Sequence, residues 1–292
     1  MFDIEREIAS QPDVWTSAAG VASGGDLPLP GRSERVVALG CGTSWFVAQA
    51  YAARRAELEV GPTDAYTPSE LPVGRSYERA VAISRSGTTT EVARVVERLV
   101  HQRVPTTAIT AVGDSPVAAA SDETVVLDFA DERSVVQTRF ATGALALLRA
   151  HLGEDLSEAI GDGRRSVEDT LPVDPSGRDH FVFLGHGWTV GLAHEAALKL
   201  REAAQATTES YPAMEYRHGP VSLAGPRSLV WVLGTPDPTI ADDVAATGAT
   251  VRVADRDPMA ELILIQRMAV ALATERGLDP DHPRHLTRSV ML

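Results

Sequence analysis

Short apolar runs alternate with longer amphipathic segments along the chain, and the first half shows this pattern most clearly. The short runs are rich in Val, Ile and Thr, and the first two stop at glycine or serine, which is typical of buried β-strands. We expect strands over residues 34–39, 80–83, 106–110 and 124–129. We expect helices over residues 45–58, 91–101 and 134–152. Strands that alternate with helices in this way predict an α/β fold, a doubly wound parallel sheet flanked by helices on both faces.

The pattern starts again after residues 153–179, whose last part, Leu-Pro-Val-Asp-Pro-Ser-Gly, has the composition of a linker. In this second half we expect strands over residues 180–184, 228–233 and 250–254. We expect helices from residue 187 to about 208 and over residues 259–276. The two halves therefore look like a coarse internal duplication. The second half lacks a serine-rich loop after its second strand, so we expect one complete active site per chain.

Composition and charge narrow the class of partner. The chain has 292 residues, of which 44% are hydrophobic, and a formal net charge of −13. This charge argues against a nucleic-acid backbone or an anionic membrane as the main partner, because both require a basic surface. It allows a small anionic substrate, since a phosphate pocket is local and can be built from backbone N–H groups and hydroxyls.

The chain has one cysteine, Cys41, so no internal disulfide can form, and no Cys/His cluster has the spacing of a zinc site. Residues 1–15 are acidic and lack an apolar run, so they do not resemble a signal peptide. No apolar stretch is long enough to span a bilayer. We expect a soluble, cytoplasmic, globular protein.

Two loops that follow consecutive expected strands carry the residues of a phosphate site. Residues 40–44 read Gly-Cys-Gly-Thr-Ser, and residues 84–89 read Ser-Arg-Ser-Gly-Thr-Thr. The helix after each loop offers unpaired N–H groups and a partial positive charge to an anion. Each loop alone is better explained by ordinary helix capping. Two such loops in one sheet favour a phosphate site, and neither a Walker A motif nor a Rossmann glycine motif is present.

These two loops, about forty residues apart, resemble those of the SIS-domain phosphosugar binders. Within that family the likeness is to the isomerase half of glucosamine-6-phosphate synthase, and it extends through residues 195–202, 215–220 and 283–290. The resemblance implies two SIS domains, each a doubly wound, flavodoxin-like parallel sheet flanked by helices. Residues 1–160 would form the first, with the phosphate loops, and residues 161–292 the second, with the catalytic helix, the His-Gly-Pro loop and the tail. The glutaminase half has no counterpart here, so we expect no ammonia from glutamine.

The resemblance also implies a set of phosphate and substrate contacts. The hydroxyl residues that match the family's phosphate-binding positions are Ser44, Ser84, Ser86 and Thr89. Further candidate substrate-binding residues are Cys41, Gly42, Thr43 and Val135. Arg85 replaces the glutamine usual in the synthase, and we expect it to add a direct charge to the phosphate contact.

The expected helix over residues 187–208 carries charged residues that suit proton transfer. Glu195, Glu202 and Glu209 are spaced by seven and would share one face, and Lys199 lies four residues after Glu195. By themselves these residues are explained by a solvated helix face with an i,i+4 ion pair. The resemblance implies a catalytic role for Glu202, as the carboxylate that moves a proton between C1 and C2. For Glu195 and Lys199, a place in the sugar site and a structural ion pair both stay open.

His218, in a His-Gly-Pro sequence, matches the histidine that opens the sugar ring in this family. In the family this histidine reaches the site from a neighbouring subunit. We therefore expect a homodimer. A sugar 6-phosphate is the expected substrate, and no metal or organic cofactor is implied, because proton transfer on an open-chain sugar needs neither.

Arg288 stands where the synthase tail has a lysine that forms an imine with the substrate. A guanidinium stays protonated and is a poor nucleophile, although it can hold a phosphate or a hydroxyl. Amine transfer is therefore disfavoured. We expect an isomerase or deaminase acting on a hexose 6-phosphate, with an amino sugar preferred. The alternatives are a dehydratase that eliminates water across C2–C3 of an N-acetylamino-sugar 6-phosphate and a non-catalytic phosphosugar sensor.

Overall fold

A computed structural model describes residues 1–235 and 237–292. These residues form two compact units. We call one the N-unit, which contains residues 13–132, 137–156 and 287–292. The other, the C-unit, contains residues 1–12, 133–136 and 157–286. Each unit includes a segment remote in sequence from its main part: the tail in the N-unit and residues 1–12 in the C-unit.

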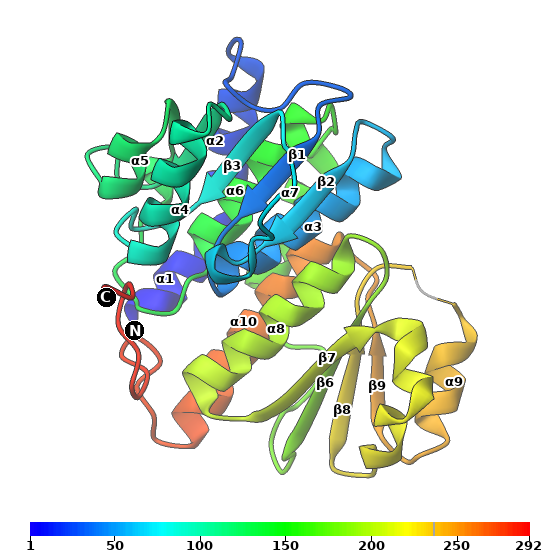
Figure 1. Cartoon of the computed structure of the whole chain (residues 1–292). Coiled ribbons are helices and arrows are strands. Elements are labelled where there is room, and N and C mark those ends of the chain that lie inside the picture. Colours follow the sequence, from blue (N-terminus) through cyan, green and yellow to red (C-terminus); the bar gives the residue numbers. More distant parts are fainter. Residues whose placement is uncertain (236) are drawn as a thin grey trace. The chain divides into compact units, whose positions relative to one another are not determined.

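The N-unit contains a five-stranded parallel sheet in the order β2-β1-β3-β4-β5 (Figure 1). Its strands are β1 (Val36–Leu39), β2 (Thr63–Tyr66), β3 (Arg79–Ile83), β4 (Thr106–Thr110) and β5 (Glu123–Val126). The register pairs Leu39 with Ala82 and Ala82 with Ala108. The carboxyl ends of β1 and β3 therefore lie side by side.

Helices cover both faces of this sheet. The N-unit helices are α2 (Gln11–Ser23), α3 (Thr43–Glu57), α4 (Thr90–His101), α5 (Pro116–Ala120) and α6 (Arg139–His151), with 3₁₀ turns η1 (Pro68–Glu70) and η2 (Asp128–Ala130). On one face Val37 and Leu39 share a core with α4. The alternate residues Val36 and Ala38 are also fully buried, and α3 contacts β1, β2 and α6. Burial on both faces explains why β1 is a continuous apolar run.

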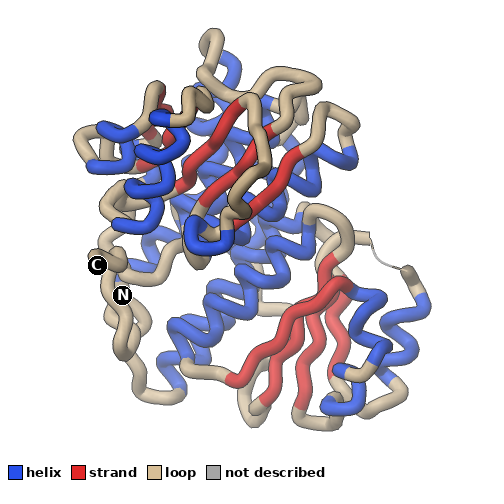
Figure 2. Tube along the Cα trace, viewed as in Figure 1, coloured by secondary structure: helices blue, strands red, loops and turns tan. Residues whose placement is uncertain are grey.

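The C-unit contains a four-stranded parallel sheet in the order β7-β6-β8-β9. Its strands are β6 (His180–Gly185), β7 (Thr207–Pro212), β8 (Ser228–Val232) and β9 (Thr250–Val253). Its helices are α1 (Asp3–Ala9), α7 (Ser157–Glu168), α8 (Thr189–Ala204), α9 (Thr239–Ala245) and α10 (Pro258–Glu275), with 3₁₀ turns η3 (Ala213–His218) and η4 (Pro220–Leu223). As Figure 1 shows, α9 lies on one face of the sheet and α8 and α10 on the other. Residues 276–292 form no regular element (Figure 2).

The predicted α/β fold, with two parallel sheets that are each flanked by helices, is confirmed. Two expected helices were wrong at one end. The helix expected over residues 134–152 begins at Arg139, because the Glu132 carboxylate accepts bonds from the N–H groups of Thr138 at 2.5 Å and Arg139 at 2.8 Å. Residues 133–136 form a bend instead.

The helix expected to reach residue 208 ends at Ala204. Gln205 takes the left-handed conformation, with φ of 50°, and its N–H and that of Ala206 donate to carbonyls of the last helical turn. This is a common helix ending. Glu209 therefore lies in β7, and its expected place on the helix face with Glu202 was wrong.

The compact units do not meet at one boundary in the sequence, because residues 133–136 belong to the C-unit and residues 287–292 to the N-unit. The division of the SIS domains after residue 160 stays a prediction.

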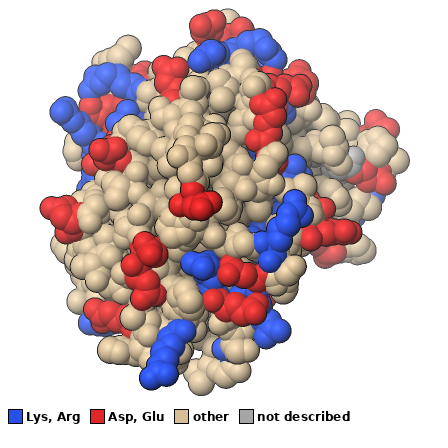
Figure 3. Space-filling view, turned by 90° about the horizontal axis from the view of Figure 1, so that it is seen from above, with Lys and Arg blue, Asp and Glu red and all other residues tan. Residues whose placement is uncertain are grey.

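The charged surface and the helices bear on possible partners. On the face drawn in Figure 3, acidic and basic side chains are interspersed around a largely uncharged area. No helix within residues 1–235 and 237–292 has the length and apolar character needed to cross a membrane.

Candidate functional site

The strand order of the N-unit places the two serine- and threonine-rich loops next to each other, at the carboxyl edge of the sheet. In the order 2-1-3-4-5 the connections from β1 and β3 leave toward opposite faces of the sheet. This switch point leaves a crevice outside the carboxyl ends of the two strands, where ligands of such sheets bind. Residues 40–44 follow β1 and residues 84–89 follow β3, so the structure brings the two predicted loops together.

The first loop makes a tight turn into α3. A Cβ atom on Gly40 would lie 2.6 Å from the backbone of Ser44, so only glycine fits there. Gly42 has φ of +54°, a conformation that glycine adopts without strain. Thr43 and Ser44 are buried in the first turn of α3. The loop thus holds two hydroxyls beside the free N–H groups of a helix start.

The second loop makes a similar turn into α4. The Gly87 N–H donates to the Ser84 carbonyl at 3.2 Å, and Ser84 and Ser86 are buried. Thr89 is the N-cap of α4, but its hydroxyl makes no capping bond to that helix. The Thr88 and Ser86 hydroxyls lie 2.9 Å apart. This loop therefore places several hydroxyls at the start of a second helix.

Arg85 lies in the second loop, and its side chain is only 1% exposed. Its Nη1 lies 3.5 Å from Oε2 of the fully buried Glu132, and its Nη2 donates to the Arg288 carbonyl at 3.2 Å. The contact with phosphate that we expected for this arginine stays a prediction. The sequence did not indicate Glu132, which lies 47 residues away and outside both loops.

The chain's last residues lie against the second loop. The Ser289 hydroxyl is 2.8 Å from that of Thr88, and the Val290 carbonyl accepts a bond from the Thr90 N–H at 3.2 Å. The Leu292 N–H donates to the Thr90 hydroxyl at 3.0 Å. The Arg288 guanidinium donates to the Glu132 carbonyl and to the Asp131 carboxylate. The structure thus places the predicted tail residue beside the predicted phosphate loop.

The C-unit holds the predicted acid–base residues on α8. Lys199 is buried, and its Nζ lies 3.3 Å from Oε1 of Glu195 and 2.7 Å from Oε2 of Glu202. Glu195 is buried as well, whereas the Glu202 side chain is 19% exposed. The ion pair foreseen between Glu195 and Lys199 is therefore present. Glu202 is the carboxylate of this row that solvent reaches most easily.

His218 lies far from Glu202 along the C-unit. Glu202 is near the end of α8, which runs antiparallel to the strands, so it lies toward the amino edge of the sheet (Figure 1). His218 is exposed and ends η3, which follows the carboxyl end of the six-residue strand β7. A strand of this length spans about 20 Å. The two residues therefore lie at opposite ends of the sheet within one C-unit.

Val135 lies in the bend at residues 133–136, and its N–H donates to the Asp281 carbonyl at 3.0 Å. The buried Glu7 carboxylate fixes this segment, because it accepts bonds from the Arg133 N–H at 2.6 Å and the Ser134 N–H at 3.3 Å. Its predicted contact with substrate stays a prediction.

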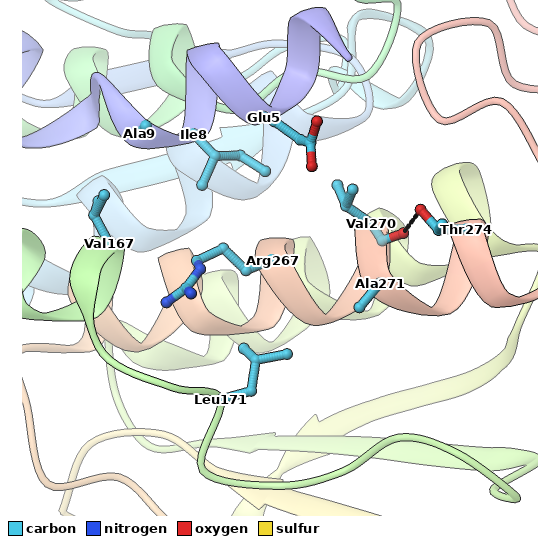
Figure 4. A pocket seen from close by; sticks show the side chains of 9 residues that line it. All are labelled: Glu5, Ile8, Ala9, Val167, Leu171, Arg267, Val270, Ala271 and Thr274. Atoms are coloured by element: carbon cyan, nitrogen blue, oxygen red, sulfur yellow. Dashed lines mark hydrogen bonds between the residues drawn. The ribbon is translucent and has the colours of Figure 1, made fainter. Parts of the chain in front are cut away.

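The C-unit also contains a groove of about 550 Å³ between α1 and α10 (Figure 4). Ile8 and Val270 line it, with Glu5 and Arg267 at its sides. The Arg267 guanidinium donates to the backbone carbonyls of Ser166 and Asp169. None of the predicted site residues lines this groove. Across the described ranges, no cluster of three or more His, Cys, Asp or Glu side chains could hold a metal ion.

Comparison with known proteins agrees with this geometry. Residues 32–150, which contain both loops, match the SIS domain family. Residues 32–150 therefore form a SIS domain. The resemblance inferred from the sequence is therefore confirmed, and the coarse class that its relatives support is that of sugar-phosphate isomerases and deaminases.

Similar proteins match nearly the whole length of the chain. It is 26% identical to the glutamine–fructose-6-phosphate aminotransferase (isomerizing) of Pyrobaculum aerophilum, over 98% of this chain and 56% of that protein. The chain thus spans about half the length of the curated relatives it matches. It is 25% identical to the solved glucosamine-6-phosphate deaminase of Thermotoga maritima, with a TM-score of 0.81 over 99% of this chain and 100% of that one. The tagatose-6-phosphate ketose/aldose isomerase of Escherichia coli shares the fold, with 21% identity and a TM-score of 0.77 over 97% and 96%.

We expect Gly87→Ala to destabilise the second loop. Gly87 has φ of +62°, and an added Cβ would lie 1.9 Å from Oγ of Ser115. The strain and the clash together should cost about 2–4 kcal/mol of the free energy of unfolding. Urea denaturation measures this change. The control is Gly153→Ala, which has φ of +91° but nothing within 4 Å and should cost about 1 kcal/mol. Equal losses in the two variants would show that the loop can move away.

We expect the Cys41 thiol to react slowly. Burial, and secondly the charge of Glu91, raises its pKa to about 11. At pH 8 roughly one thiol in a thousand is then ionised, and only the thiolate reacts. The rate of iodoacetamide alkylation should therefore rise about tenfold per pH unit from pH 7 to 10 without levelling. A rate that levels off between pH 9 and 10, as expected for the urea-unfolded chain, would contradict this. Because Cys41 is the chain's one cysteine, the labelling signal has no other source.

Proposed function

We propose that this SIS protein binds a hexose 6-phosphate and moves a proton between C1 and C2 of the open-chain sugar, as an isomerase or a deaminase. The observation that carries the proposal is the meeting of two hydroxyl-rich helix starts at the switch point of the N-unit. The lysine-paired carboxylate row on α8 supplies the acid–base chemistry. We take a cytoplasmic homodimer as part of the proposal.

The N-unit loops would hold the phosphate with neutral donors. Ser44, Ser84, Ser86 and Thr89 supply hydroxyls, and α3 and α4 each point an N-terminus toward the crevice. Helix N-termini stabilise an anion through unpaired N–H groups and the helix dipole. A site of this kind explains how a chain with a net charge of −13 can bind a dianion.

Glu202 would act as the base. Because it is partly exposed and its partner Lys199 is buried and also held by Glu195, the carboxylate is oriented while one side stays accessible. In an aldose it would take the proton from C2 and return it to C1, leaving a carbonyl at C2. With an amino group at C2 the same transfer leaves an imine, which water converts to the ketose and ammonia.

His218 would open the sugar ring, by taking the proton of the C1 hydroxyl and protonating the ring oxygen. Since it lies at the opposite end of the C-unit sheet from Glu202, one chain does not bring the two side chains together. This supports an arrangement in which each site takes Glu202 from one subunit and His218 from the other.

The relatives favour this chemistry over the alternatives. Proteins described as a glucosamine-6-phosphate deaminase and a tagatose-6-phosphate isomerase share the fold over nearly the whole chain. Glucosamine 6-phosphate is therefore the first substrate to test. Loss of water instead of ammonia or ketose would assign a dehydratase. Tight binding without turnover or exchange would assign a sensor.

Glu202→Gln should abolish turnover. Removal of the base is expected to lower kcat by about 10²–10⁴-fold, because that is the usual contribution of general acid–base catalysis. Products from glucosamine 6-phosphate, its N-acetyl form and fructose 6-phosphate are followed by NMR in heavy water, which also reports exchange at C2. The control is Glu209→Gln, since Glu209 lies in β7 bound to His180 at 3.0 Å. If Glu202→Gln keeps full turnover, the assigned base is wrong.

Mixed dimers test the shared site. Glu202→Gln and His218→Ala homodimers should each be inactive. A heterodimer of the two variants would hold one site with both groups intact. Random exchange of equal amounts should then restore about a quarter of the wild-type sites, since half the dimers are mixed and each has one good site. If the mixture stays inactive although subunit exchange is demonstrated by mass, His218 acts within its own chain or not at all.

A further inference from the structure

Three remote segments of the N-unit meet in a closed set of contacts around Arg85, and we propose that Arg85 is a positioning residue that holds the C-terminal tail over the phosphate loop. This rests on the proposed function only in assuming that the crevice beside the loop binds substrate. It replaces the simpler expectation that the guanidinium of Arg85 binds the phosphate directly. The residues of this cluster, which we call the arginine ring, are Arg85, Asp131, Glu132 and Arg288.

Both arginines of the ring donate hydrogen bonds to other members of the ring. The Arg85 guanidinium reaches the side chain of Glu132 and the backbone carbonyl of Arg288. The Arg288 guanidinium reaches the backbone carbonyl of Glu132 and the side chain of Asp131. Each arginine therefore binds a backbone carbonyl as well as a carboxylate. Arg85 binds the carbonyl of Arg288 in the tail, and Arg288 binds the carbonyl of Glu132. Such bonds fix the path of the tail, because a carbonyl cannot turn away without moving its chain.

Glu132 is fixed in turn. Its carboxylate is fully buried, and besides facing Arg85 it accepts a bond from the Thr138 hydroxyl at 2.8 Å and from the N–H groups that begin α6. A buried charge held by several bonds is costly to move. The ring is thus anchored to α6 on one side, and the tail is the element that it positions.

The tail in this position adjoins the loop and the start of α4. Ser289 meets Thr88, and Val290 accepts the bond of the Thr90 N–H. The tail therefore occupies one donor of the helix start that an anion would otherwise use. Arg85 lies on the same loop as Ser84 and Ser86, so it couples the conformation of that loop to the position of the tail.

The test uses Arg85→Gln in the full chain and measures three quantities. Amide exchange of the 287–292 segment should become at least tenfold faster. The Kd for inorganic phosphate should stay within about threefold of wild type, whereas KM for the sugar phosphate should rise about tenfold with kcat little changed. Arg85→Lys, which keeps the charge but loses the planar fork, should recover part of the exchange protection.

Controls separate this role from simple destabilisation. Arg55→Gln removes another fully buried arginine of the N-unit, which binds the carbonyls of Gly31 and Val60. It should lower stability without faster exchange in the tail. If Arg85→Gln does not fold, Arg288→Gln tests the ring from the tail, since that side chain is 37% exposed and easier to replace. It should speed exchange in the same segment.

Unchanged tail exchange in the variants that fold would overturn the proposal. A loss of phosphate affinity of tenfold or more in Arg85→Gln would also overturn it, and would make Arg85 a direct ligand. These exchange and phosphate measurements need no turnover. If the wild-type protein shows no turnover but the tail of the Arg85→Gln variant exchanges faster, the proposed function is refuted and the positioning role of Arg85 is supported.

Discussion

The reversal of strand order at β1 and β3 is the constraint on which the rest of the candidate site depends. Right-handed crossovers force the connection from each of these strands to a different face of the sheet. The two loops must then open toward the same crevice, and each must turn sharply into a helix. That requirement explains Gly40 and Gly87, where a side chain would strike Ser44 or Ser115. The glycines, the hydroxyls and the two helix starts are consequences of one topology.

Buried charge is the second feature that organises the molecule. Each unit holds a fully or nearly fully buried ion pair, Arg85 with Glu132 in one and Lys199 with Glu195 in the other. Such pairs contribute little net stability, because desolvation offsets their attraction, but they are costly to break. They therefore fix geometry more than they add stability. In the N-unit the fixed element is the tail, and in the C-unit it is the Glu202 carboxylate.

The local part of the candidate site could be read from the sequence, and the long-range part could not. Two loops of hydroxyls and glycines, each between a strand and a helix, form a pattern of neighbouring residues, so the loops at Ser44 and Ser86 could be recognised without a structure. The partners of Arg85 lie 47 and 203 residues away, and no local pattern marks them. For Glu209 a local pattern was misleading. Its spacing of seven residues from Glu202 would place both on one helix face only if the helix continued past Ala204.

The sequence by itself determined the elements whose burial is complete. The strand at Thr106–Thr110 has the expected bounds, and all its residues are buried. Edge strands such as Thr63–Tyr66 and Thr207–Pro212 were missed, since half-buried strands may carry polar residues that hide the pattern. Only the tertiary structure decided which strands are neighbours, where the tail lies and that Glu202 and His218 lie apart, because these depend on contacts between residues remote in the chain.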